Sequence, residues 1–394
     1  MHKLSRLIVL LSLLALAACG SDSNSRRGGS TEPAPEPVPE FDFSAVDESM
    51  QRFLDEEADF DGISYILVDR DLGVIHRAEF GDHTPELISL LASGSKMPAA
   101  TLLMALDNDE SLDFDVRDPI ADYLPYESLY GDRTVEQLLS NTSGLPGLLT
   151  LLLAPDLYAS HECQYRPDGN LQDCVRLIST VEVPGIQPAG SAYSYGGSGW
   201  QIAGAVAELV SNSTWAQAFD AYIAEPCGME SFVYGNMWES LAEDDEFAWT
   251  GSLDSLLGLD NPNIEGGAVA SLSDYAKLLE MQLNGGLCGD TRVLTAEAIE
   301  FMREDRGGQF GSPYGLGWFI NAPEEGAEDQ SIIYTDPGLF GDMVWADFDR
   351  GIAGFVAIDR YIFPGSSVPV EFVSEQVIGA VAAEVDRARE EVGQ

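Results

Sequence analysis

One stretch joins a short polar turn to a long apolar run: SGSKMPAATLLMAL, residues 93–106. Most residues after Met97 favour helix, so the run predicts a buried helix that begins near Ser93. Residues three apart lie on one face of a helix, which places the hydroxyl of Ser93 beside the amine of Lys96. A helix N-terminus also offers unpaired N–H groups and a positive partial charge to a developing oxyanion.

Lys96 is of a residue type that this sequence hardly uses. The chain has three lysines, at positions 3, 96 and 277, and the other 17 of its 20 basic residues are arginine. Arginine is in effect never deprotonated, whereas a desolvated lysine can lose its proton and act as a general base. This is the only Ser-x-x-Lys in the chain, and taken alone it also fits an N-cap serine with a solvated lysine.

The segment LLSNTSGLP, residues 138–146, resembles the Leu-Leu-x-His-Thr-Ser-Gly-Leu-Pro segment that follows the nucleophile in class C β-lactamase-like hydrolases. Other segments fall in the order of the same family: 112–115 (LDFD), 119–125 (PIADYLP), 266–271 (GGAVAS), 285–286 (GG) and 314–318 (YGLGW). The chain thus resembles the serine β-lactamase and penicillin-binding-protein superfamily from about residue 45 to residue 385. The resemblance implies a hydrolase that forms an acyl-enzyme on Ser93, with Lys96 as the activating partner.

The second catalytic element of that family is Tyr-x-Asn or Tyr-x-Ser, and residues 195–197 read Tyr-Gly-Gly. Tyr195 takes the tyrosine position, where a phenol near a lysine ammonium is expected to have a lowered pKa and to relay protons. The neighbouring Tyr193 is expected to serve packing. Gly197 replaces an Asn that family members use toward a substrate amide, which disfavours β-lactam hydrolysis more than ester hydrolysis.

The third element, His-Thr-Gly or Lys-Thr-Gly on an edge strand in the family, is degenerate in residues 334–341, YTDPGLFG. In that family the residue after the triplet gives its N–H to the oxyanion hole alongside the N–H of the nucleophile, here Ser93. A triplet at 334–336 would place Pro337 there, and proline has no N–H, whereas a triplet at 336–338 places Leu339 there. The second register predicts that Asp336, Gly338 and Leu339 line the site, and Tyr334 could face the cleft.

The resemblance and its departures imply a carboxylesterase-type activity on short acyl esters. A β-lactamase or a D-alanyl-D-alanine carboxypeptidase is the alternative, with an ester or amide as substrate. A second alternative is an inactive family member that serves as a binding protein of the cell envelope, because two of the three motifs are degenerate. No cofactor and no metal are expected.

Other hydrolase classes find little support in the sequence. A Ser-His-Asp enzyme needs a histidine, and the chain has only His2, His76, His83 and His161. No Gly-x-Ser-x-Gly nucleophile elbow occurs. A zinc hydrolase needs clustered ligands, and the two histidines nearest each other, at 76 and 83, have no third partner nearby in the sequence.

The first residues are typical of a secretory signal, since basic residues precede an apolar run, 7–17, that is too short to span a bilayer. The sequence LAAC, residues 16–19, resembles the processing site of bacterial lipoproteins, in which Cys19 becomes the lipidated first residue. An ordinary signal peptide with a chance cysteine is the alternative. Gly20 and Ser21 in place of Asp favour the outer membrane, so we expect a lipid anchor there, facing the periplasm.

These features divide the chain into three parts. We expect a lipoprotein signal peptide over 1–18, a lipidated tether over 19–41 and a hydrolase domain over 42–394. The tether is rich in Ser, Gly, Pro and Glu and cannot bury enough apolar surface to fold. The formal charge of −46 argues against nucleic acid and anionic lipid surfaces as electrostatic partners.

Four cysteines remain after Cys19, an even number in an exported protein, which favours disulfides over free thiols. One pairing joins Cys163 to Cys174 across a polar loop and leaves Cys227 with Cys288. Four cysteines permit three pairings, and the sequence leaves them open.

The order of the segments predicts the fold class. Strand-like stretches at 63–68 and 74–80 precede the nucleophile helix, and others at 315–320, 342–347 and 353–359 return near the end, before a helix over about 370–391. Strands at both ends with helices between them predict an α+β fold. It consists of one antiparallel sheet flanked by terminal helices and an inserted all-helical lobe, with the site at their junction.

Overall fold

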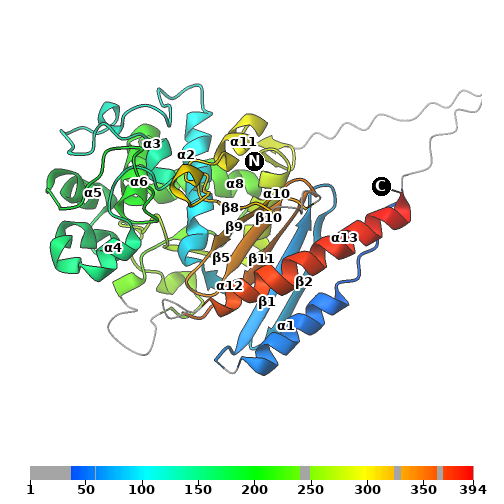
Figure 1. Ribbon diagram of the computed structural model, residues 1–394. Coiled ribbons are helices and arrows are strands. Elements are labelled where there is room, and N and C mark those ends of the chain that lie inside the picture. Colours follow the sequence, from blue (N-terminus) through cyan, green and yellow to red (C-terminus); the bar gives the residue numbers. More distant parts are fainter. Residues whose placement is uncertain (1–36, 58, 240–248, 324–329, 362–366, 394) are drawn as a thin grey trace, which may run out of the picture. The chain divides into compact units, whose positions relative to one another are not determined.

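A six-stranded antiparallel sheet carries the fold (Figure 1). The computed structural model describes residues 37–57, 59–239, 249–323, 330–361 and 367–393. The sheet belongs to the compact unit Glu40–Gln394, and the predicted signal peptide and Cys19 lie outside the described residues. The strands follow the order β2 (Gly73–Gly81), β1 (Gly62–Asp69), β11 (Ile352–Ala357), β10 (Met343–Asp347), β9 (Ile333–Pro337) and β8 (Phe319–Asn321).

Strand β1 from the start of the domain pairs with β11 from its end, and both faces of this pair are buried. Side chains alternate between the two faces, as strand geometry requires. Tyr65 and its partner Val356 pack toward the terminal helices, whereas Ile66 and its partner Phe355 pack toward the helical lobe. The sheet therefore separates two hydrophobic cores.

The terminal helices α1 (Ser44–Glu56) and α13 (Ile378–Val392) lie side by side over one face of the sheet (Figure 1). Helix α1 buries Val46, Met50 and Phe53, which share one side of the helix because they are spaced by four and three residues. The predicted C-terminal helix is present as α12 (Val368–Phe372), a π-helical turn and α13.

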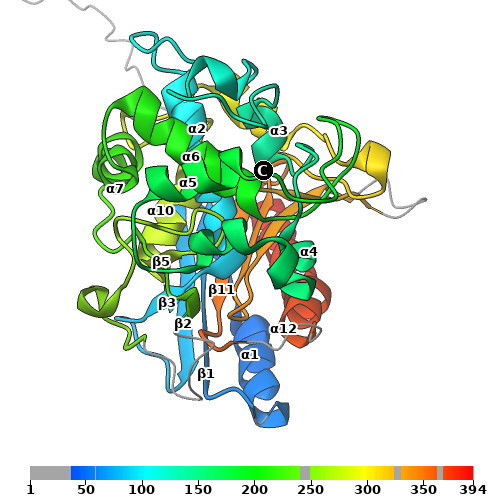
Figure 2. The same cartoon turned by 90° about the vertical axis from the view of Figure 1, so that its left-hand side faces the viewer.

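The other face of the sheet carries the inserted lobe, which begins with α2 (Lys96–Asp107). Helix α6 (Ser198–Ser211) packs against both α2 and α5 (Leu171–Thr180) (Figure 2). Within the described residues, the other α-helices and short strands are α3 (Val135–Leu139), α4 (Leu148–Leu153), α7 (Trp215–Phe219), α8 (Glu225–Cys227), α10 (Leu272–Leu283), α11 (Ala296–Arg303), β3 (Ile88–Leu90), β4 (Val233–Tyr234), β5 (Ala268–Ser271), β6 (Leu287–Cys288) and β7 (Thr291–Arg292). The predicted fold class, an antiparallel sheet with terminal helices and an inserted helical lobe, is confirmed. The inserted part is not all-helical, because β3, β5 and β4 form a three-stranded sheet there and β6 pairs with β7.

One predicted strand is shorter than expected. The stretch 315–320 forms a strand only from Phe319, because Gly317 has φ +82° and lies against the start of α2. A Cβ atom on Gly317 would lie 2.6 Å from the Cα atom of Met97. The backbone at Gly317 therefore packs closely against the nucleophile helix instead of pairing in the sheet.

Two disulfides tie the lobe together. Cys163 pairs with Cys174, which joins the 3₁₀ segment Ala159–Tyr165 to α5, and Cys227 pairs with Cys288, which joins α8 to β6. This is the first of the three pairings that the sequence left open. Within the described residues, no helix is both long enough and apolar enough to cross a membrane.

Candidate active site

The nucleophile turn is a short 3₁₀ helix, Ala92–Ser95, that runs directly into α2. Ala92 has φ +41°, a conformation that costs a residue other than glycine about 1–3 kcal/mol and needs support from its surroundings. Two buried tyrosines supply it, since Tyr275 donates to the carbonyl of Gly94 at 2.7 Å and Tyr234 donates to that of Ser95 at 2.6 Å. These two hydrogen bonds from the lobe therefore hold the nucleophile turn in place.

The two serines of this turn differ in availability. Ser95 is fully buried, and its hydroxyl accepts a hydrogen bond from the N–H of Ala268 at 3.0 Å. Ser93 is partly exposed, and its Oγ lies 3.0 Å from Nζ of Lys96. The geometry therefore supports Ser93 as the nucleophile and gives Ser95 a structural contact.

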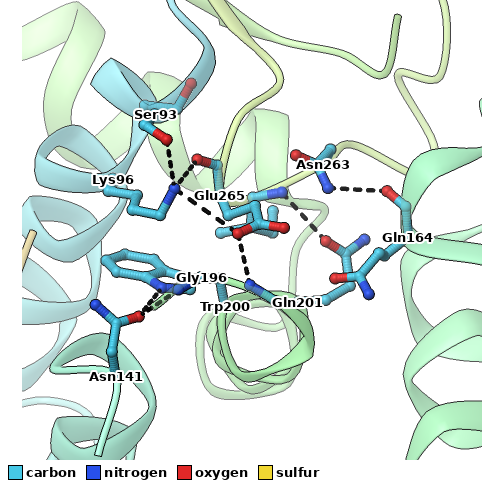
Figure 3. A network of polar contacts seen from close by, with 12 residues as sticks. Ser93, Lys96, Asn141, Gln164, Gly196, Trp200, Gln201, Asn263 and Glu265 are labelled. Atoms are coloured by element: carbon cyan, nitrogen blue, oxygen red, sulfur yellow. Dashed lines mark hydrogen bonds and ion pairs between the residues drawn. The ribbon is translucent and has the colours of Figure 1, made fainter. Parts of the chain in front are cut away.

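The amine of Lys96 is enclosed by protein, with 1% of the side chain exposed. Besides Ser93, it donates to the carbonyl of Glu265 at 2.8 Å, and it lies 3.7 Å from Oε2 of the same residue (Figure 3). Burial lowers the pKa of Lys96, and the charges of Glu265 and Asp336 oppose this. A lowered pKa makes the neutral amine, the form that can accept a proton, available at a lower pH than for a free lysine.

Tyr195 lies beside this pair, but not as the sequence predicted. The amine of Lys96 lies over the ring face, 4.7 Å from the centroid, and Ser93 is close enough to the phenol to favour a lower pKa. The prediction of a lowered pKa is wrong, because burial raises the pKa of Tyr195 well above its usual range and outweighs the opposing effect of Ser93. A neutral phenol remains a hydrogen-bond donor, so Tyr195 can still pass a proton to a leaving group.

Asn141 holds the segment that carries Tyr195. Its Oδ1 accepts hydrogen bonds from the N–H of Gly196 at 3.0 Å and from Nε1 of Trp200 at 2.9 Å (Figure 3). Sequence reasoning did not single out Asn141 as a site residue. The available signal was its position, where the resembling family segment has His.

Gly197 cannot be replaced by Asn without rearrangement. It has φ +82°, and a Cβ atom would lie 2.4 Å from the carbonyl oxygen of Pro146. Its N–H donates to Oε2 of Glu265 at 2.6 Å. A buried carboxylate from the segment before β5 thus contacts this turn, and Glu265 is a second residue that sequence reasoning missed.

The third-motif segment contacts the nucleophile turn in part. Asp336 is fully buried on β9 and accepts the N–H of Met97 at 3.0 Å, at the start of α2. Burial raises the pKa of Asp336 well above its usual range, and Lys96 opposes this. A Cβ atom on Gly338 would lie 2.3 Å from the carbonyl oxygen of Leu91, so this glycine also lies against the turn.

The other two residues that this segment was predicted to contribute to the site, Leu339 and Tyr334, have different surroundings. The N–H of Leu339 has no acceptor within the described part of the chain, which is compatible with the predicted oxyanion hole. Tyr334 packs in the core, with its ring 5.3 Å from that of Phe348 and with Arg303 over its face. These contacts give no support to Tyr334 as a lining residue. Strand β9 is also not an edge strand, because β8 pairs with its outer side.

A second serine, Ser198, lies close to a histidine, His161, but the surroundings of this pair indicate a structural role. Nδ1 of His161 lies 2.6 Å from Oγ of Ser198, and Gln164 donates to the same hydroxyl. Both members are fully buried, and burial lowers the pKa of His161 to about 4. Across the residues that the structure describes, no group of three or more His, Cys, Asp or Glu could hold a metal ion.

The chain is similar to one curated protein and to several solved structures. A relative, Penicillin-binding protein 4 of Amycolatopsis lactamdurans, is 27% identical over 269 residues, which covers 62% of this chain and 65% of the relative. The match thus spans less than two thirds of that protein's length. Among solved structures, EstCE1, a hydrolase with promiscuous acyltransferase activity, has a TM-score of 0.64 at 16% identity, covering 88% of this chain and 98% of EstCE1.

A penicillin-binding-protein homologue from Caulobacter crescentus has a TM-score of 0.63 at 19% identity, and the match covers 87% of this chain and 97% of the homologue. At such identities the two solved structures show the shared fold. The family model named Beta-lactamase matches residues 47–365, well over half of the chain. The protein therefore belongs to the beta-lactamase family, within the β-lactamase and transpeptidase-like superfamily.

Proposed function

We propose that the protein is a serine hydrolase that forms an acyl-enzyme on Ser93 and acts on short acyl esters. The observation that carries the proposal is that Ser93 is a partly exposed residue whose Oγ lies 3.0 Å from the buried amine of Lys96. The Ser93 oxygen attacks the ester carbonyl carbon while its proton passes to Lys96. The alcohol leaves with a proton returned through Lys96 or Tyr195, and water then hydrolyses the ester bond to Ser93.

Three features of the site favour esters over β-lactams and peptides. Gly197 offers no side-chain amide to a substrate amide, and the third-motif segment, residues 334–341, has no Lys or His that would assist a substrate carboxylate. The third feature is apolar surface: helix α4, whose first N–H donates to the carbonyl of Tyr195 at 2.8 Å, exposes Leu149 (68%), Leu152 (57%) and Leu153 (76%). Apolar side chains on a helix that begins at the Tyr195 backbone would suit an uncharged acyl group.

A specific observation supports each of two alternative functions. The relative from Amycolatopsis lactamdurans is named a penicillin-binding protein, which favours a β-lactamase or a D-alanyl-D-alanine carboxypeptidase. The degenerate second and third motifs favour an inactive binding protein of the cell envelope. A Ser93 that becomes phosphonylated by a fluorophosphonate or acylated by a labelled penicillin would show a live nucleophile and exclude the inactive protein. The Ser93–Lys96 pair favours the enzyme, because the fold alone does not require it.

The substrate class can be tested with two chromogenic compounds. We expect purified protein to hydrolyse p-nitrophenyl butyrate faster than nitrocefin at matched concentration, with nitrocefin turned over slowly or not at all. The short ester has a good leaving group and needs only oxyanion donors at its carbonyl. Faster turnover of nitrocefin would refute this order and favour the β-lactamase alternative.

We also propose that the mature protein is anchored through lipid on Cys19, in the outer membrane and facing the periplasm. The sequence motif at residues 16–19 supports this proposal. In a bacterial host fed with tritiated palmitate, the wild-type chain should become labelled and sediment with membranes. Cys19→Ser should remove the label and release the protein into the soluble periplasmic fraction, and a labelled Cys19→Ser chain would contradict the assignment.

A further inference from the structure

Glu265 contacts Lys96 with two different groups. Its carbonyl oxygen accepts a hydrogen bond from Nζ at 2.8 Å, and its Oε2 lies 3.7 Å from the same nitrogen. The carboxylate is 3% exposed, and each oxygen has a donor of its own: Tyr165 at 3.0 Å for Oε1 and the N–H of Gly197 at 2.6 Å for Oε2. A buried carboxylate is thus held at a fixed place beside the amine.

The backbone around Glu265 is fixed independently of its side chain. Nδ2 of Asn263 donates to the carbonyl of Gln164 at 2.9 Å, and the N–H of Ile264 donates to Oε1 of Gln201 at 3.1 Å (Figure 3). Gly196 leaves the space that the carboxylate fills, since a Cβ atom there would lie 2.5 Å from Oε2 of Glu265. Glu265 therefore packs against Gly196 and bonds to Gly197, the residue that makes the second motif degenerate.

We propose that Glu265 is a positioning residue, which holds the amine of Lys96 against the hydroxyl of Ser93. This inference rests on the proposed function, in which Lys96 accepts the proton of Ser93. The carbonyl sets the direction of the amine, and the carboxylate sets how readily the amine binds a proton.

Other groups also face Lys96, and the test must separate their effects on the pKa of Lys96 from the effect of Glu265. Asp336 approaches from β9 with its carboxylate bonded to the N–H of Met97, Tyr195 presents its ring face, and Trp200 presents its ring at 5.7 Å. Glu265 and Asp336 both raise the pKa of Lys96 against the effect of burial, and the effect of Glu265 is the larger. Removing the charge of Glu265 should therefore lower the pKa of Lys96.

The experiment follows Lys96 directly by NMR. Without the proposed signal peptide, which contains Lys3, the chain has only Lys96 and Lys277, so ¹³Cε-lysine labelling gives two signals that a Lys277→Arg variant assigns. We expect Glu265→Gln to lower the titration midpoint of Lys96 by about one pH unit or more, the effect of losing an opposite charge within 4–6 Å. The acid limb of the pH profile of kcat/KM should move in the same direction.

Gln keeps an acceptor for Gly197 and a donor for the Tyr165 hydroxyl, so the backbone contacts should survive. The matched control is Glu208→Gln. Glu208 lies near the C-terminal end of α6, and its half-buried carboxylate accepts a hydrogen bond from the N–H of Trp215. Glu208→Gln should leave the midpoint of Lys96 unchanged. Glu265→Asp keeps the charge but shortens its reach, so it should produce a smaller downward shift.

A midpoint that moves no more in Glu265→Gln than in Glu208→Gln would overturn the proposal. If Glu265→Gln does not fold, an unshifted midpoint in Glu265→Asp would overturn it. The NMR titration needs no substrate, so it tests the position of Glu265 even if the wild-type chain hydrolyses no ester. In that event the proposed function fails, while a shifted midpoint would still support the Glu265–Lys96 contact.

Discussion

Ser93→Ala is expected to abolish ester turnover, with a loss on the order of 10⁴-fold or more, because the mechanism has no second nucleophile. The fold should survive, since the Ser93 hydroxyl is partly exposed and bonds within the site rather than to the backbone of the core. Turnover of p-nitrophenyl butyrate and a circular dichroism melt measure the two effects separately.

Ser95→Ala is the matched control for this prediction. Ser95 accepts the N–H of Ala268, and losing this buried acceptor should lower the free energy of unfolding by about 1–3 kcal/mol. Covalent labelling and residual turnover should nevertheless persist. If Ser95→Ala loses labelling and Ser93→Ala retains it, the register assigned to the nucleophile turn is wrong.

Lys96→Arg is expected to lower kcat by about 100-fold or more, the size of a missing general base. Arginine keeps the charge but cannot give up its proton, whereas burial lowers the pKa of Lys96 and makes a neutral amine available. Lys96→Met, which removes the amine and keeps much of the volume, should lose as much. The assay is the rate of p-nitrophenyl butyrate hydrolysis over a range of pH.

The control is Lys277→Arg, a lysine on α10 that pairs with Asp274 at 2.9 Å and is partly exposed. This change should leave the rate unchanged. Near-normal activity of Lys96→Arg would show that Lys96 does not take part in the proton transfer and that its role is electrostatic or structural.

The sequence predicted those parts of the fold that depend on local pattern. The apolar run after Ser93 forms α2, and the amine of Lys96 does lie within hydrogen-bond distance of the Ser93 hydroxyl. Strands β1, β10 and β11 and the C-terminal helix also follow from hydrophobic periodicity. The pair is recognisable because spacing of three along one helix fixes its geometry.

What the sequence did not predict depends on contacts between distant segments. Glu265 stands 169 positions after Lys96, and nothing in its own surroundings marks it as a partner of the amine. The pKa of Tyr195 was predicted with the wrong sign, because the sequence gives the neighbouring lysine but neither its place over the ring nor the degree of burial. The direction of Tyr334, into the core beside Phe348, likewise depends on which face of β9 meets the lobe.

The central claim is that Ser93 is a live nucleophile, and active-site labelling tests it most directly. Purified wild-type protein treated with a fluorophosphonate should carry one adduct, which peptide mapping by mass spectrometry places on Ser93. Prior incubation with p-nitrophenyl butyrate should slow its formation. No adduct, or an adduct on Ser95 or Ser198 with Ser93 unmodified, would contradict the account.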